Sequence, residues 1–230
     1  MPLPKLNQPY YTHHLKGLNK KVKYRAFTVK EQKILLAAKE SDDPKEQIES
    51  MCQIVDICTE GQIDALNTPV FDIEDLFLRI RIKSVSDVSE ITYKDKKTEE
   101  IIKVEIKLDD VQVQMPEGHT NKIMISDQLG IMMKYPTLTM ALDGDKTSID
   151  ADIIKKCIDY VFDADNVYHF ADFTEQEVNE WIDSFDFGIM KQIDKFFKTI
   201  PKLRYETEIE VPSTKEKKTL VFEGLNDFFG

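Results

Sequence analysis

The sequence predicts an α+β fold, and three observations lead to this class. Apolar residues recur at helical spacing through residues 27–86, apolar and polar residues alternate in the block that follows, and the blocks lack the regular strand–helix order of a parallel sheet. The segments we expect are an extended basic N-terminal arm at 1–26, a helical subdomain at 27–86, an antiparallel β-sheet or hairpin insert at 87–142, a second helical segment packing on the first at 143–202, and a C-terminal β-hairpin with an aromatic tail at 203–230.

The N-terminal arm is predicted from residues 1–26, which carry three prolines and several lysines without any periodicity. This segment is basic, whereas the whole chain has a net charge of −11. The arm therefore either docks on an acidic surface of this protein or a partner, or forms a loosely ordered terminus.

Three helices are expected in the helical subdomain. Thr28 and Glu31 have the spacing of a capping box, so the first helix begins after Thr28. Pro44 suits the first position of the second helix, with Asp43 as its cap. The third helix is expected over residues 72–83, with its first residue as the cap.

The pattern then changes from helical spacing to alternation. The stretches "SEITY" and "IIKVEIKLDDVQVQM" alternate, and the polar run "KDKKTEE" between them predicts a hairpin. One or two further strands follow, broken near Gly130. Each such sheet would have one solvent-exposed face, as antiparallel sheets commonly do.

Helical spacing returns in the second half of the chain. A helix is expected from about Ile149 to Phe162, a second capping box at Thr174 and Glu177 begins another, and a third ends before Pro201. The remaining segment shows two alternating runs around a polar turn, which predicts the C-terminal hairpin.

Charge and cysteine content restrict the class of protein. An acidic chain with a pI of about 4.9 is a poor ligand for nucleic acid or an anionic membrane, so neither is expected as a partner. Cys52, Cys58 and Cys157 form no CxxC pair, which favours buried thiols in a reducing compartment. No signal peptide or membrane-spanning run is visible.

No catalytic, cofactor or metal site is expected. The chain lacks a Gly-rich phosphate loop and a GxSxG elbow, and its four histidines have no helical i, i+4 partners. The acidic loop from Asp143 fails as a calcium site because Ser148 and Ile154 replace the required Gly and Glu, so it reads as a turn with Ser148 or Asp150 capping the next helix. The "DADN" run at 163–166 is expected to be a solvated loop.

Contacts with partners are expected from a helix and from the tail. Arg79 and Arg81 lie two residues apart on a helix, so they point to different sides, where each either pairs within the domain or meets a partner. The tail ends in "VFEGLNDFF", whose apolar side chains must dock either on their own core or in a partner groove. The candidate partner-binding residues are Leu76, Arg79, Arg81, Phe222, Leu225, Phe228 and Phe229.

An ordered set of segments resembles a known family. It runs from "FTVKEQKILLAAKES" and "IESMCQIVDIC" through "FDIEDLFLRIRIKSVS", "MKYPT" and "FFKTIPKLRYETEI" to "GLNDFF". This set is similar to the baseplate hub family of T4-type contractile-tailed bacteriophages, the group of the T4 gene 26 baseplate subunit. Some relatives are associated with a cysteine pair in the C-terminal hairpin. Residues 203–222 contain no Cys here, so we expect no zinc site.

The resemblance implies a non-enzymatic structural or assembly protein of the baseplate hub. Its partners would be other hub and tail proteins and the tape-measure protein, with a homo-oligomer as an open alternative. It would be assembled in the host cytoplasm and located in the virion baseplate. One alternative is a transient chaperone of the tape-measure or hub proteins that is absent from the mature virion. Another is a cell-wall hydrolase, although no carboxylate pair is singled out by its spacing.

Overall fold

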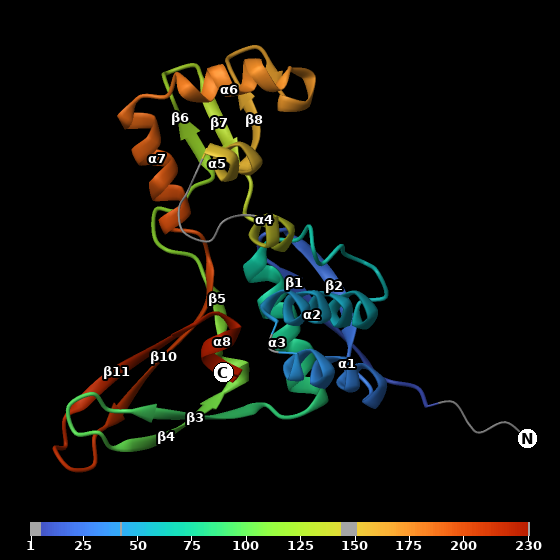
Figure 1. Cartoon of the computed structure of the whole chain (residues 1–230), viewed down its shortest axis with the longest axis vertical. Coiled ribbons are helices and arrows are strands. Elements are labelled where there is room, and N and C mark those ends of the chain that lie inside the picture. The colour runs from blue at the N-terminus through green and yellow to red at the C-terminus, as the bar shows by residue number, and fades with distance from the viewer. Residues whose placement is uncertain (1–5, 42, 144–150, 230) are drawn as a thin grey trace, which may run out of the picture. The chain divides into compact units, whose positions relative to one another are not determined.

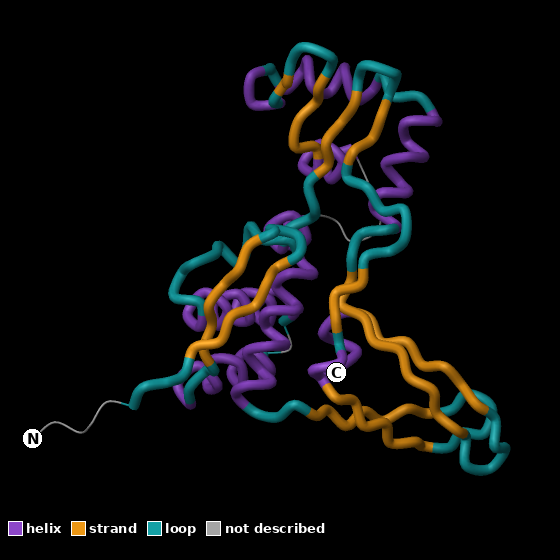
Figure 2. The backbone as a smooth tube through the Cα atoms, turned by 180° about the vertical axis from the view of Figure 1, so that it is seen from behind, coloured by secondary structure: helices purple, strands orange, loops and turns teal. Residues whose placement is uncertain are grey.

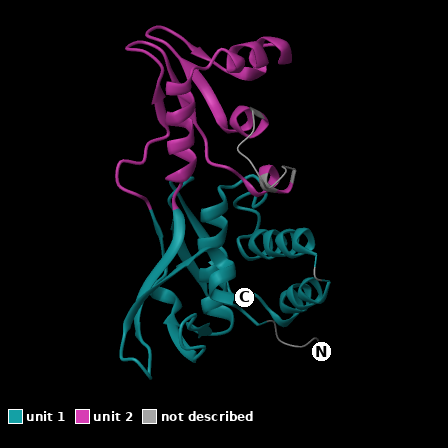
Figure 3. Ribbon diagram, turned by 60° about the vertical axis from the view of Figure 1, so that its left-hand side comes forward, with its two compact units in different colours: residues 1–114, 202–230 teal, residues 115–201 magenta. Residues whose placement is uncertain are grey.

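The computed structural model describes residues 6–41, 43–143 and 151–229 and divides the chain into two compact units (Figure 3). Unit 1 comprises Met1–Gln114 and Lys202–Gly230, and unit 2 comprises Met115–Pro201. Both contain helices and antiparallel strand pairs, which confirms the α+β class.

The elements of unit 1 come from both ends of the chain (Figure 1). They are β1 (Tyr10–Leu15), β2 (Lys20–Arg25), α1 (Val29–Glu40), α2 (Pro44–Cys58), α3 (Val70–Ser84), β3 (Val88–Lys94), β4 (Ile101–Lys107), the 3-10 turn η1 (Leu108–Asp110), β5 (Gln112–Gln114), β10 (Lys202–Glu210), β11 (Lys217–Glu223) and α8 (Gly224–Phe229).

The structure differs from the extended arm expected at residues 1–26. Strands β1 and β2 form an antiparallel hairpin in which Leu15 lies opposite Lys20. Leu15, Val22 and Tyr24 are buried, and β1 contacts α3. These buried residues alternate with outward-facing polar residues, and this alternation becomes evident only once β1 and β2 are paired. Residues 1–5 lie outside the described part of the chain.

The helix starts follow local capping chemistry. The Glu31 carboxylate accepts a hydrogen bond from the backbone N–H of Thr28, as the capping box predicts, and a further one from the Thr28 hydroxyl. The carboxylate of Asp43 accepts from the Lys45 N–H at 2.9 Å and so caps α2. Helix α3 begins earlier than expected, after Pro69, so Asp72 lies inside the helix and is not its cap.

Two long hairpins account for most of the strands of unit 1. Strands β3 and β4 pair around the polar run, as predicted, and β10 pairs with β11. The two hairpin loops lie side by side (Figures 1 and 2), where the Ser213 hydroxyl donates to Glu100 at 2.8 Å and Lys218 pairs with the buried Asp95.

Strand β5 is the last element of unit 1 before the chain enters unit 2. The long alternating run is interrupted by η1, so that β5 leaves β4 and pairs with β10. The resulting sheet has the order β11-β10-β5. Lys202 lies directly opposite Gln114, so the chain leaves unit 1 and returns to it at neighbouring positions.

Unit 2 contains a four-stranded antiparallel sheet of order β6-β7-β8-β9. Its core includes Ile131, Met133, Cys157, Ile193 and Phe196. The elements of unit 2 are β6 (Lys122–Met124), β7 (Gly130–Met133), α4 (Leu138–Asp143), α5 (Ala151–Cys157), β8 (Ile158–Phe162), β9 (Val167–Tyr168), the 3-10 turn η2 (Phe170–Asp172), α6 (Glu175–Asp183) and α7 (Phe187–Lys198).

The helix expected from about Ile149 to Phe162 is wrong over its second half. Helix α5 ends at Cys157, and β8 begins at the next residue. The sequence "IDYVF" contains β-branched and aromatic residues, and Phe162 pairs across the sheet with Gly130. Pairing with β7 therefore overrides the helical spacing. The acidic loop tested for calcium, with its proposed caps Ser148 and Asp150, lies mostly outside the described residues.

Candidate protein–protein contact sites

Helix α3 is the central element of unit 1. It contacts β1, β2, β5, β10, α2 and α8, and its apolar side chains are buried on several sides. Leu76 is fully buried, so it packs inside unit 1 and offers no surface to a partner in this conformation.

Buried carboxylates of α3 fix the N-terminal hairpin. Asp72 accepts hydrogen bonds from the backbone N–H groups of Gly17 at 3.0 Å and Leu18 at 2.8 Å. Burial raises the pKa of the Asp72 carboxyl, and those two N–H groups oppose the shift. Its position inside the helix is explained by this contact, which the sequence analysis did not foresee.

Arg79 is held within unit 1 by Asp75. The Arg79 Nε lies 3.0 Å from Asp75 Oδ1, and the guanidinium also donates to the Val111 carbonyl. Asp75 Oδ2 lies 2.7 Å from His13 Nε2. Burial raises the pKa of the Asp75 carboxyl, but the His13 and Arg79 groups outweigh burial and hold this pKa below its usual range. Arg79 is therefore already paired with groups of its own unit.

The aromatic tail forms α8 and docks on its own unit. Leu225 and Phe228 are buried, as is Phe222 in β11 just before the helix. The Ser89 hydroxyl of β3 donates to the Phe228 carbonyl at 2.7 Å, and the Leu225 N–H donates to Glu74 of α3 at 3.3 Å. Of the two alternatives for the tail, the structure shows docking on its own core.

Gly224 allows the chain to turn from β11 into α8. Its φ of +72° lies in the left-handed region, where a side chain is strained. A Cβ atom there would also lie 3.1 Å from Glu74 Oε1, the group that accepts the Leu225 N–H. Glu74 is half-buried, and this burial raises the pKa of its carboxyl.

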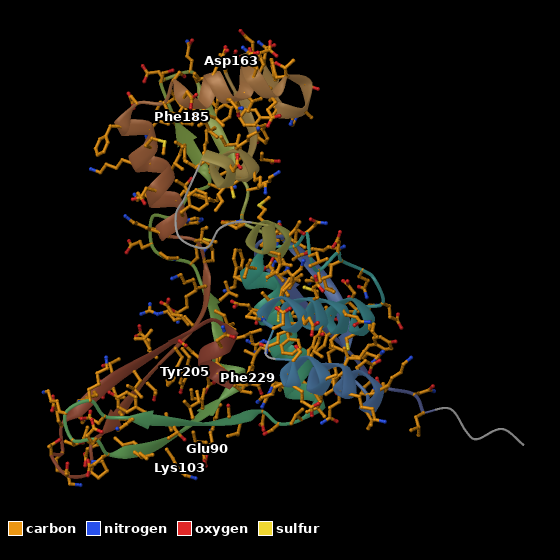
Figure 4. The ribbon with its side chains drawn as sticks, in the orientation of Figure 1. Glu90, Lys103, Asp163, Phe185, Tyr205 and Phe229 are labelled. Carbon is orange, nitrogen blue, oxygen red and sulfur yellow. The ribbon has the colours of Figure 1, made fainter. Side chains whose placement is uncertain are left out.

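The part of this region that reaches the surface contains Arg81 and Phe229. Both side chains are half-buried, and the Arg81 guanidinium carbon lies 4.1 Å from the centre of the Phe229 ring. Phe229 is labelled in Figure 4. A cation over an aromatic face is attracted by the ring quadrupole. Burial lowers the pKa of Arg81, whose ordinary value lies far above neutrality. The candidate residues thus divide into a buried set and this half-buried pair, with Arg79 bound to Asp75.

Unit 2 carries a pocket that the sequence did not predict. Its volume is about 440 Å³, and it lies between α6 and the β8–β9 turn. Aromatic side chains and two carboxylates line much of it, namely Tyr168, Phe170, Phe173, Trp181, Asp163 and Glu177. The density of aromatic residues between 168 and 181 was the signal that could have indicated it.

An exposed apolar position lies on α7. The Phe187 side chain is 86% exposed, and Met190, three residues on, is also exposed. Residues three apart lie on one face of a helix. The two side chains therefore add exposed apolar area to one face of α7.

The three thiols are buried, and burial raises the pKa of Cys52 to about 12 and those of Cys58 and Cys157 to about 11. Within the described ranges, His, Cys, Asp and Glu side chains form no group able to hold a metal ion. The helices of these ranges lack the length and apolar character needed to cross a membrane.

Comparison with known proteins identifies the family. Neither curated proteins nor solved structures gave a match. The model of the T4 bacteriophage base plate protein family matches residues 8–230, which confirms the resemblance at the level of the baseplate. Because this match covers nearly the whole chain, the protein belongs to the T4 bacteriophage base plate protein family, and it is a structural protein of the virion's tail baseplate that contacts other baseplate proteins.

Proposed function

We propose that the protein acts at the hub of the baseplate, as a structural or hub-assembly component that works through protein–protein contacts and not through catalysis. The observation that carries this proposal is the family match over residues 8–230. The order of segments from "FTVKEQKILLAAKES" to "GLNDFF" adds the resemblance to the hub group. Its partners would be hub and tail proteins, including the tape-measure protein, and it would assemble in the host cytoplasm.

Within unit 1, the proposed contact is the surface formed by Arg81 and Phe229. The buried side chains of Leu76, Phe222, Leu225 and Phe228 would support this surface from below, and Arg79 would hold α3 against β5. Deleting the tail cannot test the contact, because the deletion removes Leu225 and Phe228 from the core. The substitution Phe229→Ala removes a half-buried ring and leaves those two in place.

Co-expression with the other hub proteins of the same phage tests this contact. Phe229→Ala should weaken co-purification with one of them, whereas Ile101→Ala, at an exposed position of β4 outside this surface, should leave that interaction unchanged. Both variants should keep the native circular dichroism spectrum. Equal recovery of the partner with both variants would remove Phe229 from the proposed surface.

The alternative function is a transient chaperone of the tape-measure or hub proteins. The exposed Phe187 and Met190 favour it, because a shielding protein needs free apolar surface. Quantitative mass spectrometry of purified virions distinguishes the two roles. A stoichiometric amount supports the structural role, and depletion from finished particles relative to assembly intermediates supports the chaperone. Sedimentation of the purified protein tests the homo-oligomer.

A hydrolase remains a third alternative, and the carboxylates of the pocket in unit 2 argue against it there. A glycoside hydrolase needs one carboxylic acid that stays protonated near neutral pH. Hydrogen bonds from Tyr168 and from Thr174 lower the pKa of Asp163 and of Glu177, respectively, so both are ionised. A zymogram on host cell wall should show no clearing.

A further inference from the structure

We infer that the pocket in unit 2 binds an arginine side chain presented by a neighbouring baseplate protein. This inference deepens the proposed action through protein–protein contacts and rests on it, but it does not depend on a place at the hub. It is carried by the combination of aromatic walls and two carboxylates in one cavity.

The walls of the pocket are largely aromatic. The rings of Phe170 and Trp181 meet edge to face, with centroids 5.9 Å apart. The rings of Tyr168 and Phe173 are tilted, with centroids 6.4 Å apart. Phe173 is an exposed large apolar side chain at this site. A guanidinium group stacks on such rings and is less strongly hydrated than an ammonium, so the walls favour arginine over lysine.

The charge of the pocket is negative. Asp163 and Glu177 line it, and its lining residues include no Lys, Arg or His. Asp163, which is labelled in Figure 4, lies in unit 2. It accepts hydrogen bonds from the Tyr168 hydroxyl at 2.6 Å and from the N–H groups of Asp165 and Asn166, each at 2.8 Å. Glu177 accepts from the Thr174 N–H at 2.8 Å and its hydroxyl at 2.7 Å. These neutral donors fix both carboxylates in place and leave their charges uncompensated.

Fixed carboxylates beside aromatic faces match the two needs of a guanidinium group. Its flat face stacks on a ring, and its edge donates hydrogen bonds to carboxylate oxygens. The nearest ion pair on α6, between Lys155 and Glu175 at 3.1 Å, uses a different carboxylate. The volume of about 440 Å³ admits one arginine side chain with part of its backbone.

Trp181 makes this inference directly testable, because it is the single tryptophan of the chain and lines the pocket. The full-length protein is titrated with N-acetyl-arginine amide while the tryptophan emission is followed. N-acetyl-citrulline amide, which has the same shape without the charge, and N-acetyl-lysine amide are titrated at matched ionic strength. We expect saturable binding of the arginine probe with a dissociation constant of roughly 1–10 mM, and at least about tenfold weaker binding of the citrulline probe.

Two isosteric substitutions test the carboxylates. Glu177→Gln keeps a capping-box side chain, and Asp163→Asn keeps a side chain that accepts from its own turn. The double variant should bind the arginine probe about tenfold more weakly. Asp183→Asn removes one charge from the exposed side of the same helix and should change the affinity less than twofold.

Specific results would overturn the inference. Equal responses to arginine and citrulline would remove the role of charge, and stronger binding of lysine would contradict the assignment to arginine. If Asp183→Asn weakened binding of the arginine probe as much as the double variant does, the binding would reflect the overall negative charge of the protein and not the two carboxylates of the pocket. If the double variant does not fold, the arginine–citrulline comparison on the wild-type protein still decides. The outcome of these titrations does not depend on whether the protein is found in purified virions, so the inference and the proposed function can fail separately.

Discussion

Replacing Phe228 by alanine should destabilise unit 1 strongly. The ring is 1% exposed, and it lies among α3, β3, β10 and β11, the elements that α8 contacts. Truncating a buried Phe loses the transfer free energy of the ring and leaves a cavity, which together cost about 3–5 kcal/mol. With a urea m-value of about 2 kcal/mol/M, the unfolding midpoint of unit 1 should fall by roughly 1.5–2.5 M.

Urea titration followed by far-ultraviolet circular dichroism measures this shift, with tryptophan emission recorded in parallel. Trp181 belongs to unit 2, so its emission separates the unfolding of that unit from that of unit 1. The matched control is Phe187→Ala, which truncates the same side chain where it is 86% exposed and should cost within about 0.5 kcal/mol. If the two variants unfold at the same urea concentration, α8 is not part of the core and the reasoning about the tail is refuted.

Three further predictions concern titration and reactivity. Burial lowers the pKa of His119 below 6.5, so the unfolded chain binds more protons than the folded one below this pH, and the stability of unit 2 should fall as the pH drops below 6.5. Thermal melts followed by Trp181 emission measure this fall, and the substitution His119→Gln should reduce it. Burial alone would raise the pKa of Glu31, but hydrogen bonds from Arg25 and Thr28 lower this pKa to about 2, so up to about 3 kcal/mol of folding stability should be lost as the pH falls from 4.5 towards 2. Acid titrations followed by circular dichroism measure this loss, and the substitution Glu31→Ala should remove it. The three buried thiols should not react with a disulfide reagent in the native protein and should react fully in denaturant, and one fast thiol in the native state would contradict their burial.

The elements that the sequence predicted correctly are those fixed within a few residues. The capping boxes at Thr28 and Thr174 each join groups three positions apart, and the β3–β4 turn lies between its own strands. Short-range chemistry of this kind is readable without tertiary structure.

The features that were missed depend on residues far apart in the chain. Asp72 suits a helix cap by sequence, yet it binds a turn at residues 17–18 that precedes it by more than fifty positions. Residues 158–162 form strand β8 because they pair with β7. The sequence left two alternatives open for the tail, because the apolar side chains could be buried equally well in the protein's own core or in a partner groove, and they lie in the core. The pocket of unit 2 was missed because its carboxylates and rings meet only after folding.

The direct pairing of Lys202 with Gln114 also determines the order in which the chain can fold as it is made. Residues 115–201 emerge from the ribosome before β10 exists, so at 5–20 residues per second strand β5 waits on the order of ten seconds for its neighbour. Unit 2 is by then fully synthesised, whereas the central strand of the β11-β10-β5 sheet of unit 1 is still missing. The unit that begins first is thus completed last, and its unpaired strand edge is the part of the nascent protein most open to misassociation.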